Sequence, residues 1–460
     1  MKRESIWNKY SEKQLTELEK LSKSYKSFLD QGKTERECVS QMVDRVEEEG
    51  YVELSKLIRE NKKVREGDKI YAVNMEKNII LFHIGQKPLE EGMNILGAHI
   101  DSPRLDIKQN PLYEEGDFAY MDTHYYGGIK KYQWVTIPLA IHGVVVKKDG
   151  TTVIVSVGED EDDPVFFISD LLIHLASEQM EKKATKVIEG EMLDIIVGNK
   201  PLEGEEKDKV KAGILRILKE EYDIEEEDFI SAELEVVPAG KARDAGFDRS
   251  MILGYGQDDR VCSFTSLEAM LRTKKCKRTG CTILVDKEEI GSVGATGMQS
   301  HFFENAVAEL MALMGDFSEL KLRRCLANSR MLSSDVGAGF DPSFASCFDK
   351  NNVAYLGHGM ILKKFTGARG KSGSNDANAE YIGFLRKVME KAEVSFQTAE
   401  LGKVDQGGGG TIAYILSLYG MQVIDCGVPV LNMHAPYEAT SKADLYEVMR
   451  GYQAFLKSDE

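Results

Sequence analysis

The sequence predicts an α/β fold, a mixed-sheet sandwich of strands and helices that is interrupted by an inserted β-rich domain. Two observations carry this prediction. Short apolar runs alternate with helix-like runs from Met251 onward, and residues 104–245 follow a different, hairpin-rich pattern. Alternation of strands and helices is typical of an α/β sandwich with a largely parallel sheet. A chain of 460 residues also exceeds what one core usually serves and suits two or three domains.

We expect the main domain to consist of residues 1–103 and 246–460, with the inserted domain at 104–245. The first part begins with helices, because Leu15, Leu18 and Leu21 recur near the helical period. Thr34–Glu37 is a capping box ahead of a second amphipathic helix. Three strand-like runs then follow, at Ile70–Val73, Ile79–Phe82 and Met93–Ala98.

In the inserted domain, two valine-rich runs flank Asp149-Gly150, which is a hairpin signal. Helical stretches are expected near 168–183 and 208–221. In the second part of the main domain we expect strands at Cys281–Val285 and Met421–Ile424, and helices at Phe303–Met314 and Leu445–Leu456. Ser441 is the expected cap of the last helix.

Composition excludes several classes of function. The chain has 59 Lys and Arg against 76 Asp and Glu, a formal net charge of −17, which disfavours nucleic acid and anionic membrane surfaces as partners. Seven scattered cysteines without a Cys-x-x-Cys pair disfavour a disulfide framework or a thiolate zinc site. The longest apolar stretch, 137–146, is too short to span a bilayer, and no signal peptide is visible. We therefore expect a cytoplasmic protein.

Acidic and imidazole residues recur where apolar strand-like runs end. They are His99 with Asp101, the pair Asp258-Asp259, the pair Glu288-Glu289, Asp335 and His434. Each is a weak signal alone, since adjacent acids usually lie on a solvated surface. Acids at the mouth of a buried strand, however, are costly unless they are paired or bound to metal. The repetition of this pattern favours a site.

The inventory of these residues fits a two-metal hydrolase. Two divalent ions about 3.5–4 Å apart can share one carboxylate, while each takes a further carboxylate and an imidazole. The chain supplies such a set in His99, His434, Asp258, Glu289 and Asp335. Oxygen and nitrogen donors without thiolate favour Zn²⁺, with Mn²⁺ and Co²⁺ as alternatives.

Two carboxylates remain beside this set. Asp101 is the expected hydrogen-bond acceptor that fixes the tautomer of His99. Glu288 stands next to a predicted ligand, where a carboxylate can take a proton from a metal-bound water and pass it to a leaving amine.

The sequence resembles the M18 metalloaminopeptidases, the aspartyl aminopeptidase family. The resemblance is carried, in order along the chain, by the words Ala98-His99-Ile100-Asp101-Ser102-Pro103, Asp258-Asp259-Arg260, Asp286-Lys287-Glu288-Glu289-Ile290-Gly291-Ser292, Ser334-Asp335 and Met433-His434. It implies a metallopeptidase sandwich with an inserted β-rich dimerisation domain. It further implies that one ion is held by His99, Asp258 and Asp335. The other ion would be held by Asp258, Glu289 and His434, with Asp258 as the bridge and Glu288 as general base.

The resemblance also implies a homo-oligomer, a tetrahedral dodecamer built from dimers with active sites facing an inner chamber. Ile173-His174-Leu175 resembles the segment whose histidine reaches a neighbouring subunit's active site; the alternative is a helix histidine that is satisfied locally. Gly359–Lys363 resembles a strand whose lysine receives an acidic substrate side chain, and the alternative for Lys363 is an ordinary strand-end lysine.

The leading hypothesis is a dinuclear-metal aminopeptidase that acts on peptides. The resemblance implies a preference for an N-terminal Asp or Glu, and the alternative is a different preferred residue. A second hypothesis keeps the metal site but changes the substrate to another amide, as in a deacylase or carboxypeptidase. A third is a non-catalytic, shell-forming assembly protein.

The four-glycine run at 407–410 lacks the Lys-Ser/Thr ending of a phosphate-binding loop, so we expect a flexible loop near the substrate pocket.

Overall fold

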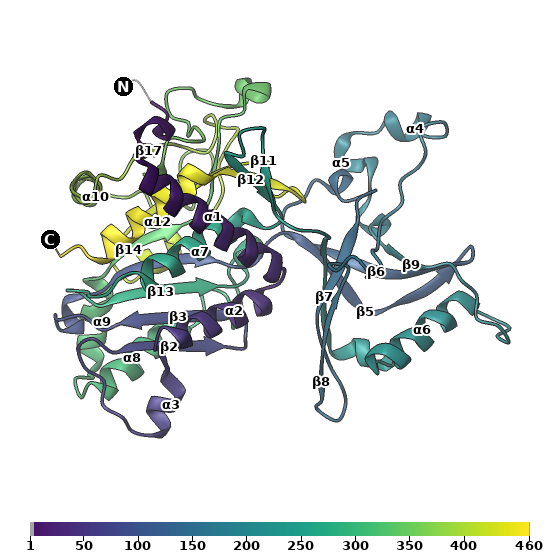
Figure 1. The fold of residues 1–460 in the computed structure, drawn as a ribbon, viewed down its shortest axis with the longest axis horizontal. Coiled ribbons are helices and arrows are strands. Elements are labelled where there is room, and N and C mark those ends of the chain that lie inside the picture. The colour runs from purple at the N-terminus through teal and green to yellow at the C-terminus, as the bar shows by residue number, and fades with distance from the viewer. Residues whose placement is uncertain (1–3, 460) are drawn as a thin grey trace. The chain divides into compact units, whose positions relative to one another are not determined.

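The computed structural model describes residues 4–459 and confirms the mixed α/β class (Figure 1). The chain divides into two compact units. The first contains the described residues of Met1–Asp101 together with Ala242–Met433 and those of Glu438–Glu460. The second contains Ser102–Lys241 and the short segment His434–Tyr437.

The first unit is built on a nine-stranded sheet with the order β1-β2-β3-β13-β4-β14-β18-β16-β17. Its strands are β1 (Val52–Glu53), β2 (Lys69–Asn74), β3 (Asn78–His83), β4 (Asn94–His99), β13 (Gly280–Val285), β14 (Arg330–Ser334), β16 (Met360–Lys363), β17 (Phe396–Thr398) and β18 (Gln422–Gly427). The four central strands, β13, β4, β14 and β18, are parallel neighbours. Their carboxyl ends therefore meet at one edge of the sheet, where α/β proteins commonly bind ligands.

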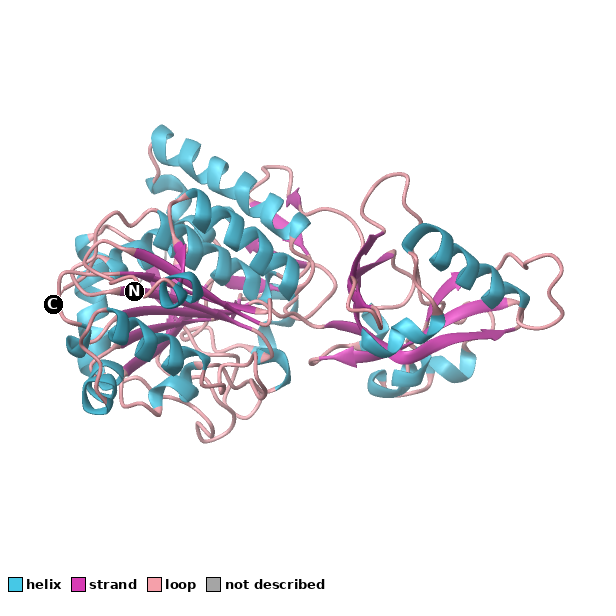
Figure 2. Cartoon of the chain, turned by 90° about the horizontal axis from the view of Figure 1, so that it is seen from below, coloured by secondary structure: helices cyan, strands magenta, loops and turns pink. Residues whose placement is uncertain are grey.

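Helices cover both faces of this sheet (Figure 2). In β3, Ile79 and Leu81 face one core and Ile80 and Phe82 face the other, as the alternation of a strand requires. The first core includes residues of α1 (Glu12–Gln31), α2 (Glu35–Glu48), α7 (Gln257–Leu271), α10 (Ala379–Lys391) and α12 (Lys442–Leu456). The second includes residues of α3 (Leu54–Arg59), α8 (Phe302–Leu313), α9 (Glu319–Ala327) and α11 (Ala413–Ser417).

Local sequence signals explain where several helices begin. The predicted capping box at Thr34 is confirmed, because its hydroxyl accepts the N–H of Glu37 while the Glu37 carboxylate accepts the N–H of Thr34. Ser441 caps α12 through a hydrogen bond from the N–H of Ala443. Helix α7 is buried from Gln257 to Met270, so it fixes the positions of both its ends.

A smaller sheet completes the first unit. Its order is β11-β12-β20-β19-β15, with β11 (Arg243–Ala245), β12 (Met251–Gly254), β15 (Gly337–Ala338), β19 (Pro429–Leu431) and β20 (Glu438–Ser441). Strand β12 leads directly into α7, and β20 leads directly into α12. The small sheet therefore anchors the starts of two helices that pack on the central sheet.

The second unit is a six-stranded antiparallel sheet with the order β8-β7-β10-β5-β6-β9. Its strands are β5 (Arg104–Glu115), β6 (Phe118–Tyr126), β7 (Leu139–Val146), β8 (Thr152–Val157), β9 (Ile195–Gly198) and β10 (Ala232–Pro238), and its helices are α4 (Ser177–Met180), α5 (Ala184–Val187) and α6 (Lys209–Tyr222). The hairpin at Asp149-Gly150 is confirmed as the β7–β8 turn. Helix α6 confirms the helix expected near 208–221.

The helix expected over 168–183 is wrong. Only Ser177–Met180 is helical there. The apolar side chains of Leu171, Leu172 and Ile173 are 46–69% exposed, so they do not pack against the second unit. A helix of this length owes most of its stability to packing of an apolar face, and that packing is missing within this chain.

No helix among residues 4–459 combines the length and the apolar character needed to cross a lipid bilayer.

Candidate metal and catalytic site

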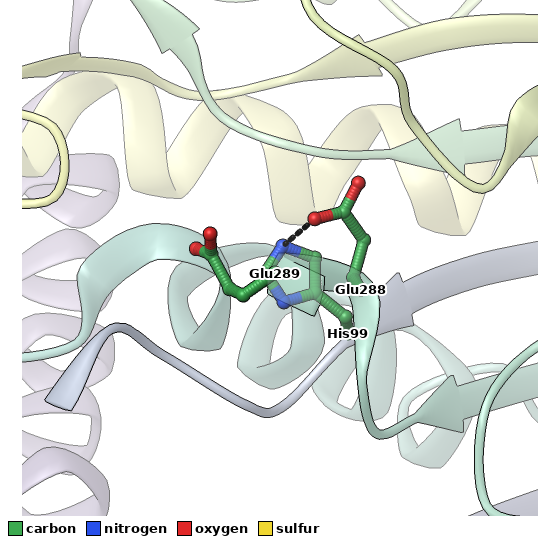
Figure 3. Close-up of side chains that lie close together, drawn as sticks. All are labelled: His99, Glu288 and Glu289. Atoms are coloured by element: carbon green, nitrogen blue, oxygen red, sulfur yellow. Dashed lines mark ion pairs between the residues drawn. The ribbon is translucent and has the colours of Figure 1, made fainter. Parts of the chain in front are cut away.

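His99 is the last residue of β4, and its ring is almost fully buried. Its Nδ1 lies 3.0 Å from the carbonyl oxygen and 3.2 Å from the carboxylate of Asp101. These acceptors hold the proton on Nδ1, which leaves Nε2 as the ligand atom. Nε2 lies 3.3 Å from a carboxylate oxygen of Asp258. It also lies 4.0 Å from a carboxylate oxygen of Glu288, a contact drawn as a dashed line in Figure 3.

Asp101 has a second function that sequence reasoning missed. Its two carboxylate oxygens accept the backbone N–H groups of Glu288 and Glu289, each at 3.1 Å. Asp101 therefore joins the loop after β4 to the loop after β13. The available signal was that both loops follow apolar strands, and parallel neighbouring strands bring such loops together.

Asp258 and Asp259 lie at the start of α7, and the peptide bond between them is cis. The backbone N–H of Asp258 donates to the carboxylate of Glu438, which is buried on β20. The carboxylate of Asp259 accepts the N–H of His99 at 3.4 Å. No sequence pattern predicted a function for Asp259 or Glu438. Nothing local marks Glu438, because its partner is 180 residues away.

Arg260 is fully buried and fixes the backbone next to His99. Its Nε donates to the carbonyl of Ile100 at 3.1 Å, and a terminal nitrogen donates to the carbonyl of Lys33 at 3.0 Å. The guanidinium also lies 5.2 Å from the ring centre of Tyr255. This structural use of Arg260 was also missed, although the residue stands inside the word Asp258-Asp259-Arg260.

Asp335 follows β14, and its backbone N–H donates to the carbonyl of Cys426. A side chain at Gly427 would meet the Asp335 carbonyl oxygen at 2.0 Å, so only glycine permits this close approach. Lys363 ends β16 and is 5% exposed. Its ammonium donates to the carbonyls of Asp335 and Val336 at 3.3 and 3.0 Å.

In the first unit, four predicted site residues besides Asp101 gather around His99. One ligand atom each from His99, Asp258 and Asp335 lie within 4.8 Å of one another. The same holds for His99, Glu288 and Glu289. The two groups share His99, so they form one continuous cluster.

Two predicted site residues lie in the second unit. His434 is on the segment between β19 and β20, and its Nδ1 lies 2.9 Å from the carbonyl oxygen of Gly128. His174 lies in an exposed turn of the apolar segment 171–175, not on a helix.

The buried groups of the site shift one another's pKa values. Burial and the charge of Asp335 raise the pKa of Glu288 to about 8, against a lowering influence of His99. Burial and Asp258 raise the pKa of Asp335 to about 6, while Lys363 opposes the shift. Burial alone would lower the pKa of His99, but its bonds to Asp101 and Asp258 raise it well above the ordinary value.

The charge and the donor atoms of the cluster indicate whether a metal ion fits the site. Four carboxylates surround one imidazole in a largely buried space, so the cluster carries excess negative charge. A divalent cation would balance that charge. The donors are oxygen and nitrogen atoms, which suits Zn²⁺, Mn²⁺ or Co²⁺. The residues present therefore fit the metal site that the sequence predicts.

Comparisons with known proteins agree on one family. The family model described as "Aminopeptidase I zinc metalloprotease (M18)" matches residues 28–456. A protein of Clostridium acetobutylicum named "Probable M18 family aminopeptidase 1" is 64% identical over 99% of this chain and 98% of its own length. The crystal structure of an M18 family aminopeptidase from Thermotoga maritima superposes with a TM-score of 0.95 at 44% identity, covering 99% of each chain.

A more distant structure shares the fold. The S. cerevisiae mApe1 dodecamer matches with a TM-score of 0.76 at 20% identity, covering 94% of this chain and 95% of its own.

Proposed function

The chain belongs to the M18 family of zinc metalloproteases and is a metallo-aminopeptidase, and on that premise we propose that it works with two metal ions and with Glu288 as general base. The observation that supports the proposal is the cluster around His99, where carboxylates from three separate chain segments converge at the carboxyl edge of the sheet. The reaction would be hydrolysis of the first peptide bond, which releases the N-terminal residue.

We assign the first ion to His99, Asp258 and Asp335, and the second to Asp258, Glu289 and His434. Support for the first set is the mutual approach of its ligand atoms. Support for His434 comes from the chain path. It follows β19 by three residues, and four residues later Glu438 accepts the N–H of Asp258. Zn²⁺ is the metal we propose, with Mn²⁺ and Co²⁺ as alternatives.

Divalent ions held by these residues would supply Lewis acidity toward the scissile carbonyl and would lower the pKa of a bound water. Glu288 would take the proton of the attacking water and return it to the leaving amine. The bond from its N–H to Asp101 fixes its backbone, and its side chain is 14% exposed, so the carboxylate is held yet remains accessible. Asp101 thereby orients both His99 and Glu288.

A defined peptide tests the proposed activity. Zinc-loaded protein is expected to remove residues one at a time from the free N-terminus, as followed by mass spectrometry, and to leave an N-acetylated copy intact. Release from the C-terminus would favour a carboxypeptidase, and removal of the acetyl group alone would favour a deacylase. No release by metal-loaded protein would favour the non-catalytic assembly hypothesis.

Acceptance of an acidic N-terminal residue is the finer part of the proposal. Its support is the positive charge of Lys363, whose ammonium donates to the carbonyls of Asp335 and Val336 and therefore lies beside a proposed metal ligand. Peptides that differ only in an N-terminal Asp, Glu or Leu test it. If Lys363 receives the acidic side chain, Lys363→Met lowers kcat/KM more for the peptides that begin with Asp or Glu than for the peptide that begins with Leu.

Zinc binding is expected to release protons and to strengthen as pH rises from about 6 to 8. The reason is that the pKa values of His99, Asp335 and Glu288 are all raised without metal, so the site holds protons that a cation must displace. Calorimetric titration in two buffers of different ionisation enthalpy measures the released protons. A zinc affinity that stays constant across this pH range would contradict the expectation.

We also propose that the protein is cytoplasmic and forms a homo-oligomer, with a tetrahedral dodecamer built from dimers as the specific arrangement. None of the seven cysteines, which all lie among residues 4–459, forms a disulfide, and this suits a reducing compartment. Support for self-association through the second unit comes from its exposed apolar segment, 171–175, which leaves Leu172, Ile173 and Leu175 54–69% exposed.

If this segment enters a second copy, His174 would serve the partner's metals, where its imidazole could donate to the oxyanion. Loss of one such donor typically costs about 10²–10³-fold in rate. His174→Ala and Glu288→Ala chains are then each expected to be nearly inactive alone. Co-expressed, they would form some sites with both defects and some with neither, so a sizeable fraction of activity would return.

Differently tagged chains would verify mixing, and peptide release would report activity. Mixing without recovery would place His174 in its own chain's site or in no site. A matched control is His301→Ala, because His301 is also an exposed histidine but lies in the first unit. That variant should keep the parent's rate.

A further inference from the structure

Asp425 is a buried carboxylate to which the catalytic proposal gives no task. It lies on β18, directly opposite Ser333 of β14 and Lys363 of β16. Residues that are opposite one another on neighbouring strands project from the same face of a sheet. The Asp425 carboxylate and the Lys363 ammonium are therefore neighbours, with 0% and 5% of each residue exposed.

The positively charged ammonium of Lys363 lies against the backbone of Asp335, a proposed metal ligand. Its ammonium donates to the carbonyls of Asp335 and Val336, so it fixes the backbone from which the Asp335 carboxylate projects. A buried ammonium is costly unless an opposite charge accompanies it. A cation bound by Asp335 would offset the charge of that carboxylate, and Asp425 would then be the carboxylate that balances Lys363.

Asp425 has a second contact, with the end of the glycine run. The hydroxyl of Thr411 donates to its carboxylate at 2.5 Å. Thr411 directly follows 407–410, and its hydroxyl also accepts the N–H of Ala413 at the start of α11. Asp425 thus contacts Thr411 at the end of the glycine run and lies opposite Lys363, whose ammonium in turn holds the Asp335 backbone.

We propose that Asp425 is a positioning residue, which balances the charge of Lys363 and thereby holds the Asp335 backbone in the geometry that binds metal. The inference rests on the proposed metal assignment of Asp335. Asp425 itself would touch neither metal nor substrate. Such outer partners of metal ligands typically contribute about 10–100-fold to metal affinity.

A double-mutant cycle tests this function. Zinc dissociation constants are measured by chelator competition for the parent, Asp425→Asn, Lys363→Met and the double variant. We expect each single change to weaken zinc binding about 10–100-fold. If Asp425 acts through Lys363, the double variant binds zinc no more weakly than Lys363→Met alone. The proposal would be overturned if Asp425→Asn bound zinc as tightly as the parent. It would also be overturned if the loss of zinc affinity in the double variant equalled the product of the two single losses.

A matched control separates positioning from general stability. Asp444 is also fully buried, and it accepts the N–H groups of Gly357 and Gly359, two residues that are not proposed metal ligands, at 2.7 Å. Asp444→Asn should lower the thermal midpoint of the metal-free protein and leave zinc affinity unchanged. An equal loss of zinc affinity in this control would assign the effect of Asp425 to destabilisation and overturn the proposal.

Two further comparisons keep the test decisive. If Asp425→Asn does not fold, Lys363→Met and the double variant are compared directly: equal zinc affinities support the proposal, and a further loss in the double variant overturns it. Peptide release by the parent is measured in parallel. A parent that binds zinc but releases no N-terminal residue would contradict the proposed activity while the zinc affinities still decide the function of Asp425.

Discussion

Replacement of Glu288 by glutamine is expected to lower kcat by about 10²–10⁴-fold, the contribution of a general base, while metal content stays at the parent's level. The amide cannot accept a proton from water, but Glu288 is not among the proposed ligands. The change is also nearly isosteric and leaves the backbone bond to Asp101 in place. Metal analysis and peptide-release kinetics on the same preparation measure both quantities.

The adjacent residue is the matched control. Glu289→Gln alters a proposed ligand whose backbone is held by the same Asp101 carboxylate. It is expected to lose metal as well as activity. If Glu288→Gln lost metal and Glu289→Gln retained it, the functions of the two glutamates would be reversed.

Asp258→Ala is expected to abolish binding of both ions and to reduce turnover to background, because Asp258 is the proposed bridge. The contact that anchors its backbone should survive, since the bond to Glu438 uses the main-chain N–H and not the side chain. The loss can therefore be assigned to the missing carboxylate. Equilibrium dialysis with zinc, followed by metal analysis, gives the number of ions bound per chain.

His434→Ala supplies the comparison, because it removes a ligand from the second ion alone. It should retain one ion per chain, with the first site intact. Equal stoichiometry in the parent, Asp258→Ala and His434→Ala would contradict the bridging assignment.

Much of the site could be predicted because its residues follow a local rule. His99 is the last residue of β4, and Glu288 and Asp335 follow β13 and β14 within three residues; these central strands are parallel neighbours. The carboxyl ends of such strands meet at one edge, so a pattern read along the chain becomes a cluster in space. The α/β class followed from the same alternation.

The contacts that hold the site together were not predictable in this way. Glu438 and Arg260 act on partners more than 150 residues away in sequence, and no local pattern marks which buried polar group bonds to which. The opposite error occurred at 168–183, where apolar residues looked helical. Those residues remain exposed, so the packing that would have stabilised a helix is absent from this chain.

The central claim is that Asp258 bridges two ions, and anomalous diffraction from crystals grown with zinc tests it most directly. The account predicts two anomalous peaks about 3.5–4 Å apart, with the Asp258 carboxylate between them. One peak should lie against His99 and Asp335, and the other against Glu289 and His434. A single fully occupied peak, or two peaks that do not share Asp258, would contradict it.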